Sequence, residues 1–309
     1  MFYNLENFFD TINDITHLDD DYTPNGKYKW DTKKYQSKII NLSRVLMQSA
    51  KKTPDIIGVC EIESKTAIKD LLKHQSFEDE YDFIHYDSPD ERGIDVGFIY
   101  RKNALKVIDS YPLKISLTKN SKDKTRDILY LKVIVDNKAD TLNIMICHLP
   151  SRGGGKAKSE QNRIDVAKQI RKHIDKIGIN KKWIVMGDFN DEPWDIAITD
   201  ILKSYDINDY KVNDSNLLNL MWPLKSNKLG TYNYQGKWQI LDQMIISASL
   251  NQSRGWHYQN ESIQIIKQDW MMQTGKYQDF PKRTYIGTKW TNGYSDHLPV
   301  KFNLIYNND

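Results

Sequence analysis

Short apolar runs recur along the chain and predict many β-strands. They include DIIGVCEI, YDFIHY, DVGFIYR, ILYLKVIV, TLNIMICHL, KWIVMGDF, ILDQMIIS and LPVKFNLI. Runs of about four to eight residues suit strands, whereas a helix usually needs about ten or more. So many runs of this length exclude a mainly helical protein.

Two stretches, 35–46 and 164–174, have the period of an amphipathic helix instead, with apolar residues three or four positions apart. The residues concerned are Tyr35, Ile39, Leu42 and Leu46, and Ile164, Ala167, Ile170 and Ile174. Some strands alternate apolar and polar positions while others are apolar throughout, which favours two sheets packed face to face with helices outside. No Pro/Gly/Ser-rich linker or repeat interrupts the chain, so we predict one α/β (α+β) domain over residues 1–309.

Two segments, 206–236 and 255–293, carry polar and aromatic residues without a clear period and are predicted to be long loops. The second contains Trp256, Trp270, Met271 and Met272. These could form a membrane-touching hairpin or a base-stacking surface. A small core beneath the loop is the interpretation we favour.

The net charge of +3 on 309 residues gives no strong overall attraction to nucleic acid or membrane, and 39% apolar residues exclude a disordered chain. The charge is unevenly distributed. Residues 1–31 contain seven acidic and two basic side chains, a net charge of −5, whereas 151–182 contains ten basic and three acidic ones, a net charge of +7. A positive local field is therefore expected around the second segment.

Both cysteines, Cys60 and Cys147, lie in apolar runs and are predicted to be buried free thiols, which excludes a disulfide scaffold. No run approaches the roughly 20 apolar residues of a membrane span. The chain opens abruptly with the strand-like MFYN. We therefore expect either an exported protein whose N-terminal signal has been removed or a cytoplasmic one.

Polar residues follow several predicted strands: Glu61, His148, Asp188, Asn190, Asp242, Asp296 and His297. Side chains alternate along a strand, so Asp188 and Asn190 share one face while Phe189 points into the core. Carboxylate and amide oxygens suit magnesium, manganese or calcium, whereas zinc would favour more imidazole or thiolate. Phosphate chemistry is the usual use of such a site.

Each of these residues also has a structural interpretation. Asn4 could be a turn residue, Glu61 a solvated strand end and His148 a core histidine. Asp188, Asn190 or Asp191 could cap a helix predicted in DEPWDIAITDILK. Asp242 follows apolar residues, where a carboxylate needs a partner such as His297. Their joint occurrence with SDHLPV favours a catalytic site.

Together, Asn4 in FYNLEN, Glu61 in GVCEIES, His148 in CHLPSRGG, GDFNDEP, Asp242 in LDQMII and YSDHLPV resemble the endonuclease/exonuclease/phosphatase superfamily, which has the DNase I-like fold. The motifs follow the family's order from Asn4 to Val300. The YNLENFFD and HLPSRGGG stretches are similar to a branch common in Bacteroides-type bacteria. The resemblance implies a four-layer α/β/β/α sandwich and cleavage of phosphate esters that depends on Mg²⁺, or on Mn²⁺ or Ca²⁺.

The resemblance also implies residue roles. Glu61 would be the main metal ligand with Asn4 beside it, and Asp296 would complete the metal environment. Asp188 would orient or deprotonate the attacking water, and Asn190 would contact phosphate or metal. His297 would stabilise the phosphoryl oxygens or act as the base, with Asp242 holding its ring. His148 matches a second histidine that abasic-site nucleases lack, and Arg126 matches a phosphate-contacting arginine of DNase I-like members.

The SRGGGKAKSEQNR stretch after His148 is either a flexible loop or an anion cradle in which Arg152 and Lys156 bind substrate, and we favour the cradle. Arg163, on the following helix, is expected to face solvent.

These observations predict a phosphodiesterase, a nuclease or nucleotide phosphodiesterase in first place. A phospholipid or sphingomyelin phosphodiesterase, an inositol-phosphate phosphatase and a catalytically silent binding domain are the alternatives. The expected partner is a phosphodiester substrate such as DNA or RNA. A monomer without a stable protein partner is expected.

Overall fold

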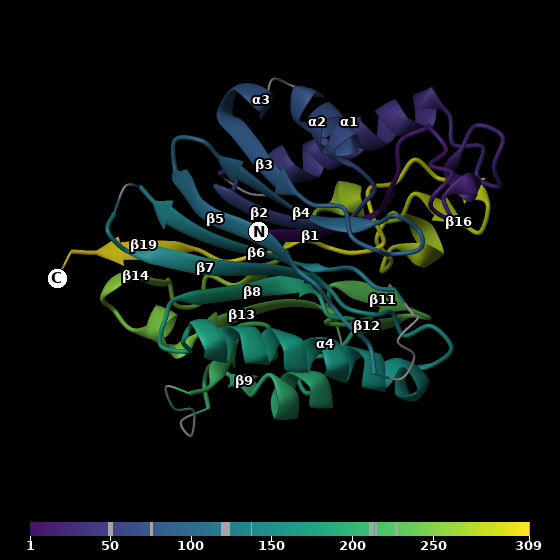
Figure 1. Cartoon of the computed structure of the whole chain (residues 1–309). Coiled ribbons are helices and arrows are strands. Elements are labelled where there is room, and N and C mark those ends of the chain that lie inside the picture. The colour runs from purple at the N-terminus through teal and green to yellow at the C-terminus, as the bar shows by residue number, and fades with distance from the viewer. Residues whose placement is uncertain are drawn as a thin grey trace.

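The computed structural model describes residues 1–48, 52–74, 77–118, 124–136, 138–209, 213, 215–225 and 228–308. Two large mixed sheets pack face to face, and helices cover their outer faces (Figure 1). Helices α1, α2 and α3 lie over one sheet and α4 lies over the other. This arrangement confirms the predicted four-layer α/β/β/α sandwich of the DNase I-like type.

The first sheet has six strands in the order β15-β18-β1-β2-β4-β3. Their bounds are Gln264–Ile265, Val300–Lys301, Phe2–Phe8, Ile56–Ile62, Asp95–Arg101 and Tyr81–His85. β1 and β2 are parallel and the other neighbours antiparallel. The helices over this sheet are α1 (Thr32–Gln48), α2 (Lys65–Lys73) and α3 (Phe77–Glu80). The four periodic apolar residues predicted to face the core in α1 are all buried.

The second sheet has seven strands in the order β5-β6-β7-β8-β13-β10-β9. Their bounds are Leu105–Leu113, Ile128–Val135, Thr141–His148, Trp183–Asp188, Asp242–Ser247, Leu217–Asn219 and Ser204–Asp206. α4 (Lys156–Ile177) covers this sheet, and the helix expected after β8 is reduced to a π-helical turn at Ala197–Ile201. β5 was missed because Asp109, Ser110 and Pro112 interrupt its pattern; as an edge strand it tolerates the proline.

Short elements lie outside the two large sheets, several of them in the two predicted loops. Small strand pairs are β11 (Tyr232–Tyr234) with β12 (Lys237–Gln239), β14 (Gly255–Tyr258) with β19 (Leu304–Asn307), and β16 (Tyr285–Ile286) with β17 (Lys289–Trp290). Single 3-10 turns occupy Asp20–Tyr22, Trp222–Leu224, Ala248–Asn251, Asp269–Met271 and Gly275–Tyr277. The predicted final strand LPVKFNLI is divided, since β18 pairs within the first sheet while β19 pairs with β14.

The sheets approach each other closely at Gly58 of β2, where an added Cβ would lie 2.7 Å from Met186 Sδ of β8. A larger residue there would separate the layers that carry the strand ends. Cys60 and Cys147 are buried and free, as predicted. In the described part of the chain, no helix is long and apolar enough to cross a bilayer.

The Met271 and Met272 side chains are buried in the core between the first sheet and its helices, and Trp270 packs against the same core. Trp256 is buried in the core between the sheets. The core interpretation of these residues is therefore confirmed, and the apolar hairpin is not formed.

Candidate active site

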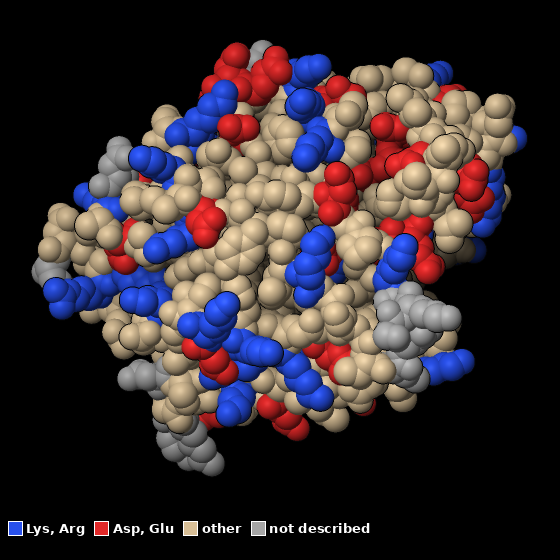
Figure 2. Space-filling model, in the orientation of Figure 1, with Lys and Arg blue, Asp and Glu red and all other residues tan. Residues whose placement is uncertain are grey.

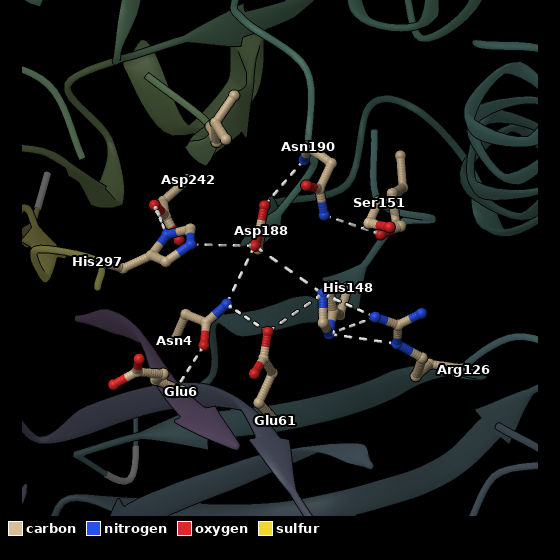
Figure 3. Close-up of polar contacts among 12 residues, drawn as sticks. Asn4, Glu6, Glu61, Arg126, His148, Ser151, Asp188, Asn190, Asp242 and His297 are labelled. Carbon is tan, nitrogen blue, oxygen red and sulfur yellow. Dashed lines mark hydrogen bonds and ion pairs between the residues drawn. The ribbon is translucent and has the colours of Figure 1, made fainter. Parts of the chain in front are cut away.

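The polar residues that follow the strands meet at one edge of the sandwich (Figure 3). Asn4 lies on β1 and Glu61 near the end of β2, both in the first sheet. His148, Asp188 and Asp242 lie on β7, β8 and β13 of the second sheet, where the backbone register places them side by side. His297 precedes β18 and forms a backbone bridge with Tyr232.

Asn4 joins the two sheets. Its Nδ2 donates to Glu61 Oε1 at 3.1 Å and to Asp188 Oδ2 at 3.0 Å. The Asn4 side chain is oriented by its own Oδ1, which accepts from the Glu6 backbone N–H at 2.9 Å. The orientation of Asn4 excludes the simple turn role, because its amide lies between the buried carboxylate of Asp188 and the partly buried carboxylate of Glu61.

Glu61 has a backbone conformation unusual for a non-glycine residue, with φ of +61°. The β2-β4 register shifts between Cys60 and Ile62, and the β1-β2 register shifts between Asn4 and Phe8. These irregularities allow the Asn7 N–H to donate to Glu61 Oε2 at 2.8 Å. Strained backbone costs about 1–3 kcal/mol and concentrates at functional sites, so the bulge makes Glu61 a candidate functional residue.

His297 and Asp242 form a close buried pair. His297 Nδ1 lies 2.7 Å from Asp242 Oδ2, and Nε2 lies 3.7 Å from Asp188 Oδ2. The Tyr232 ring lies against the imidazole, with centroids 4.9 Å apart. Burial alone would lower the pKa of His297, but the carboxylates of Asp242 and Asp188 outweigh it and raise that pKa well above its usual value. His297 is therefore an imidazolium at neutral pH.

The pKa of Asp188 is raised to about 7, mainly by burial and also by Asp242, while His297 acts in the opposite direction. The Asn190 N–H donates to Asp188 Oδ1 at 2.8 Å, so one oxygen is fixed and Oδ2 points toward the other site residues. Asn190 has a φ of +50° and its Nδ2 donates to the Leu149 carbonyl at 3.1 Å. Asp188 is therefore a candidate for the general base that the sequence motifs predict.

His148 is neutral. Burial and the neighbouring guanidinium of Arg126 lower its pKa well below the usual value. Arg126 faces both ring nitrogens: its Nε donates to Nδ1 at 3.2 Å, and its Nη2 lies 2.9 Å from Nε2. That nitrogen is 3.8 Å from Glu61 Oε1 and 3.9 Å from Asp188 Oδ2.

Arg126 itself is buried and its Nη1 lies 3.3 Å from Asp90 Oδ2. Arg126 therefore contacts the His148 ring and fixes its orientation. Its predicted contact with phosphate stays a prediction.

A sequence profile of the endonuclease/exonuclease/phosphatase family matches residues 1–306. The chain belongs to this family. The resemblance inferred from the motifs is confirmed, and the family assignment makes the protein a hydrolase of phosphate esters. No curated protein matches the sequence.

Several solved structures share the fold at low sequence identity. A conserved protein of unknown function from Enterococcus faecalis has a TM-score of 0.59 and 12% identity over 99% of both chains. TDP2 from D. rerio, complexed with a single-strand DNA product, has a TM-score of 0.58 and 15% identity over 89% of this chain and 94% of its own. A mannosyl-6-phosphatase from Bacteroides thetaiotaomicron has a TM-score of 0.56 and 14% identity over 88% and 92%.

The potential metal-ligating side chains at this site fit a hard divalent cation. Glu61, Asp188 and Asp242 bring three carboxylates together, while His297 supplies the closest positive charge. Donor atoms of Asp188, Asp242 and His297 lie within 4.8 Å of one another. Asp242 Oδ1 is buried and has no hydrogen-bond partner in the part of the chain that the structure describes. The remaining negative charge favours a bound cation.

Three predicted residues are engaged elsewhere. Asp296 Oδ2 accepts from Arg283 Nη2 at 2.8 Å, while Arg152 and Lys156 contact Asp195 at 3.2 and 2.6 Å. Asp296 stands outside the group of carboxylates within reach of one ion, and the two cations of the glycine stretch are already paired. Their roles as metal ligand and anion-binding groups therefore stay predictions.

Arg163 contradicts the expectation of a solvent-facing residue. Its side chain is 0% exposed, and its Nε lies 2.7 Å from Asp191 Oδ1. The loop after β8 folds over α4 and places Asp191 against this helix, which the helical period alone could not show. Asp191 is consequently an ion-pair partner of Arg163.

Arg92 was missed by the sequence patterns. It is an exposed residue of the loop between β3 and β4, and its Nη1 donates to Asn7 Oδ1 at 3.3 Å. Burial would raise the pKa of Glu61, yet Arg92 is the largest of the influences that lower it below the usual value. No motif or period distinguishes this arginine, because its role depends on how the loop folds back over β1.

Glu63, two residues beyond Glu61, gives a stability prediction. Burial and the neighbouring carboxylates of Asp10 and Asp19 raise its pKa to about 8. A folded-state pKa above the unfolded value means that stability falls as pH rises from about 5 to 8. Glu63→Gln should therefore stabilise the protein by about 1–2 kcal/mol at pH 8.5, after allowance for partial exposure, with little change at pH 5.

This prediction is checked by urea unfolding in EDTA across pH 5 to 9. Glu78→Gln, at an exposed glutamate of α3, is the control and should give no pH-dependent difference. A Glu63→Gln effect of equal size at both pH limits would contradict the proposed protonation.

Proposed function

We propose that the protein is a divalent-metal-dependent phosphodiesterase that acts on nucleic acids or nucleotides. The observation that carries this proposal is the contact of Asn4 with both Glu61 and Asp188, opposite the buried His297–Asp242 pair. The arrangement combines acidic oxygens, one neutral imidazole and one imidazolium around a common point (Figure 3). Such a set suits attack of water on a phosphate ester.

Glu61 and Asn4 would hold the metal, proposed to be Mg²⁺, with Mn²⁺ or Ca²⁺ as substitutes. Enzymes of this family typically depend on a divalent metal. The bound ion would neutralise phosphate charge and stabilise the leaving oxygen.

The protein's own residues divide the remaining tasks. Asp188 Oδ2 would orient the attacking water and accept its proton. The His297 imidazolium would donate to the non-bridging phosphoryl oxygens, while Asp242 fixes its ring. His148 places its Nε2 beside Glu61 and Asp188, where the ring would help to position the same oxygens, and Arg126 would hold the ring in place.

The substrate class rests on two observations. The single-strand DNA product reported with D. rerio TDP2 supports a nucleic-acid substrate, while the Bacteroides mannosyl-6-phosphatase shows that this fold also serves sugar phosphates. The burial of Met271 and Met272 removes the apolar hairpin that a phospholipase would need. We therefore favour DNA, RNA or a nucleotide, with a sugar phosphate as the second candidate, and a monomeric enzyme.

The test is nicking of supercoiled plasmid with Mg²⁺, Mn²⁺ or Ca²⁺, with and without EDTA. Wild type should nick in a metal-dependent way, and His297→Ala should lose the activity while retaining the folded circular dichroism spectrum. His17, which is half-buried outside the active site and pairs with Asp14, is replaced by Ala as the control and should leave nicking unchanged. Absence of nicking together with metal-dependent release of phosphate from a hexose phosphate would replace the nuclease proposal by the sugar-phosphatase one.

A further inference from the structure

A second group of metal-ligating side chains lies outside the active site. It contains His85, the last residue of β3, Asp87 in the loop that follows, and Asp95, the first residue of β4. One donor atom of each residue lies within 4.8 Å of the others. The three residues are held together by the β3-β4 pairing, in which His85 is opposite Gly97.

This group lies on a different face of the first sheet from the core between the sheets. Side chains alternate between the two faces of a strand, so Asp95 and Ile99, four positions apart in β4, point to the same face. Ile99 packs toward the helices, whereas Val96 and Phe98 pack between the sheets. His85 likewise points to the same face as Phe83, two positions earlier in β3, and Phe83 packs against the helical layer. The group is therefore separate from Glu61 and Asn4, which contact the second sheet.

His85 is in an unusual state for a buried histidine. Its side chain is 0% exposed, and among the described residues neither ring nitrogen has a hydrogen-bond partner. Nε2 lies 3.3 Å from Asp95 Oδ2 and Nδ1 lies 3.7 Å from Asp87 Oδ1. An ordinary His–Asp ion pair would direct an N–H at the carboxylate, and leaving a buried polar group unpaired costs about 1–3 kcal/mol. A third component that binds the imidazole would remove this cost.

The carboxylates are arranged to share such a component. The backbone N–H and hydroxyl of Ser88 both donate to Asp95 Oδ1, which fixes that carboxylate and leaves Oδ2 facing the ring. Asp87 reaches the group from the solvent side, with a side chain that is 77% exposed. An ion can therefore enter from the Asp87 side.

The group also borders an acidic cavity of about 530 Å³. Besides Asp87 and Asp95, the cavity is lined by Asp10, Asp14 and Glu63. Acidic side chains gather on the upper right of the face in Figure 2, over the segment that follows β1. The cavity supplies space for metal-bound water and a negative potential that attracts cations.

We propose that His85, Asp87 and Asp95 form a second divalent-metal site, which an ion such as Zn²⁺ can occupy. One imidazole and two carboxylates are a ligand set suited to zinc or manganese, with water in the remaining position. Ligand atoms of tetrahedral zinc lie about 3.3 Å apart, which matches the 3.3 Å between His85 Nε2 and Asp95 Oδ2. Asp87 Oδ1 lies nearer the other ring nitrogen, at 3.7 Å from Nδ1, and would reach the ion from its exposed position. The presence of an imidazole distinguishes this site from an oxygen-only magnesium site.

The site would fasten the loop between β3 and β4. That loop carries Asp90, the partner of the buried Arg126, and Arg92, which contacts Asn7. A metal ion that joins Asp87 to the two strand ends would therefore stabilise the loop on which both arginine contacts depend. This inference stands whether or not the active site acts on nucleic acids.

The test measures bound zinc in EDTA-treated, dialysed protein by metal analysis after equilibrium with Zn²⁺. Wild type and the double variant Glu61→Gln/Asp188→Asn, which weakens the active site, form two backgrounds. In each background, His85→Gln and Asp87→Asn should lower the zinc content by one equivalent or weaken its Kd at least about tenfold. Asp79→Asn, at an exposed aspartate of α3, is the matched control and should change neither quantity.

Co²⁺ provides a second readout that does not depend on activity. Its visible absorption in the double-variant background should disappear with Asp87→Asn, an exposed position where the substitution leaves the core intact. Equal zinc content and equal Co²⁺ spectra with and without Asp87→Asn in both backgrounds would overturn the proposal and leave His85 as an ion-paired histidine.

Discussion

Asp188→Asn is expected to lower kcat/KM for phosphodiester hydrolysis by about 10²–10⁴-fold, the usual contribution of a positioned general base. Asparagine keeps the shape of the side chain and can still accept from the Asn190 N–H, which bonds Asp188 Oδ1 at 2.8 Å. It cannot take a proton from water. The loss should therefore appear in kcat, with a smaller change in KM.

The measurement is steady-state hydrolysis of a chromogenic phosphodiester at saturating Mg²⁺, together with an unfolding curve. Asp200→Asn is the matched control, because Asp200 is exposed in the π-helical turn that follows β8, where it accepts from the neighbouring Thr199 hydroxyl. It should keep activity within about twofold. An Asp188→Asn enzyme that retains a tenth of the wild-type kcat would contradict the assignment of the base.

The sequence was most informative where a polar residue interrupts an apolar run. Glu61, His148, Asp188 and Asp242 each follow apolar strand residues, and burying such groups is costly unless they are paired. The alternation of side chains along a strand also predicted that Asp188 and Phe189 point to opposite faces. These local rules, combined with family resemblance, were sufficient to predict the fold and the group of residues that meets at the sheet edge.

Contacts between loops could not be predicted in the same way. Arg152 and Lys156 follow His148 directly in the sequence, yet Asp195 from the loop after β8 neutralises both. Asp296 similarly finds Arg283, a residue of the long segment between β15 and β18. Each pairing joins two irregular segments whose paths are set by tertiary packing, so no period or motif indicates it.

The backbone irregularity at Glu61 was a second feature that the sequence did not predict. The run DIIGVCEI predicts a regular strand, but Glu61 adopts a positive φ and shifts the register with β4. A regular strand would point alternate side chains to opposite faces, and the bulge changes the direction of Glu61 without changing the hydrophobic pattern around it. The geometry of the site therefore depends on a local distortion that residue types do not reveal.

The buried Arg163–Asp191 pair should give the largest stability effect. Arg163 also donates to the Ser159 hydroxyl at 2.7 Å and to the Lys156 carbonyl at 3.0 Å, so its guanidinium organises the start of α4. Asp191 is 1% exposed, and its carbonyl accepts from Gln243 of β13 at 2.9 Å. The pair thus connects α4 and the loop after β8 to the second sheet.

Arg163→Met should lower the free energy of unfolding by about 3–5 kcal/mol at pH 8, because it leaves the buried Asp191 with only the more distant Arg152, whose Nη2 is 3.9 Å away. Burial already raises the pKa of Asp191 to about 6 against the opposing influence of Arg163, and removal of Arg163 would raise that pKa further. A folded-state pKa above the unfolded one means stability lost as pH rises, so the deficit should be smaller at pH 5 than at pH 8.

Urea unfolding at both pH values measures the effect, with Lys172→Met, at an exposed position of the same helix, as the control expected to stay within about 0.5 kcal/mol. The double variant Arg163→Met/Asp191→Asn should recover much of the loss, because neither charge then remains buried. If the double variant were as unstable as Arg163→Met at pH 8, the destabilisation would come from lost packing and lost donation to Ser159. Recovery of stability in the double variant would show instead that most of the destabilisation in Arg163→Met comes from a buried charge left without its partner.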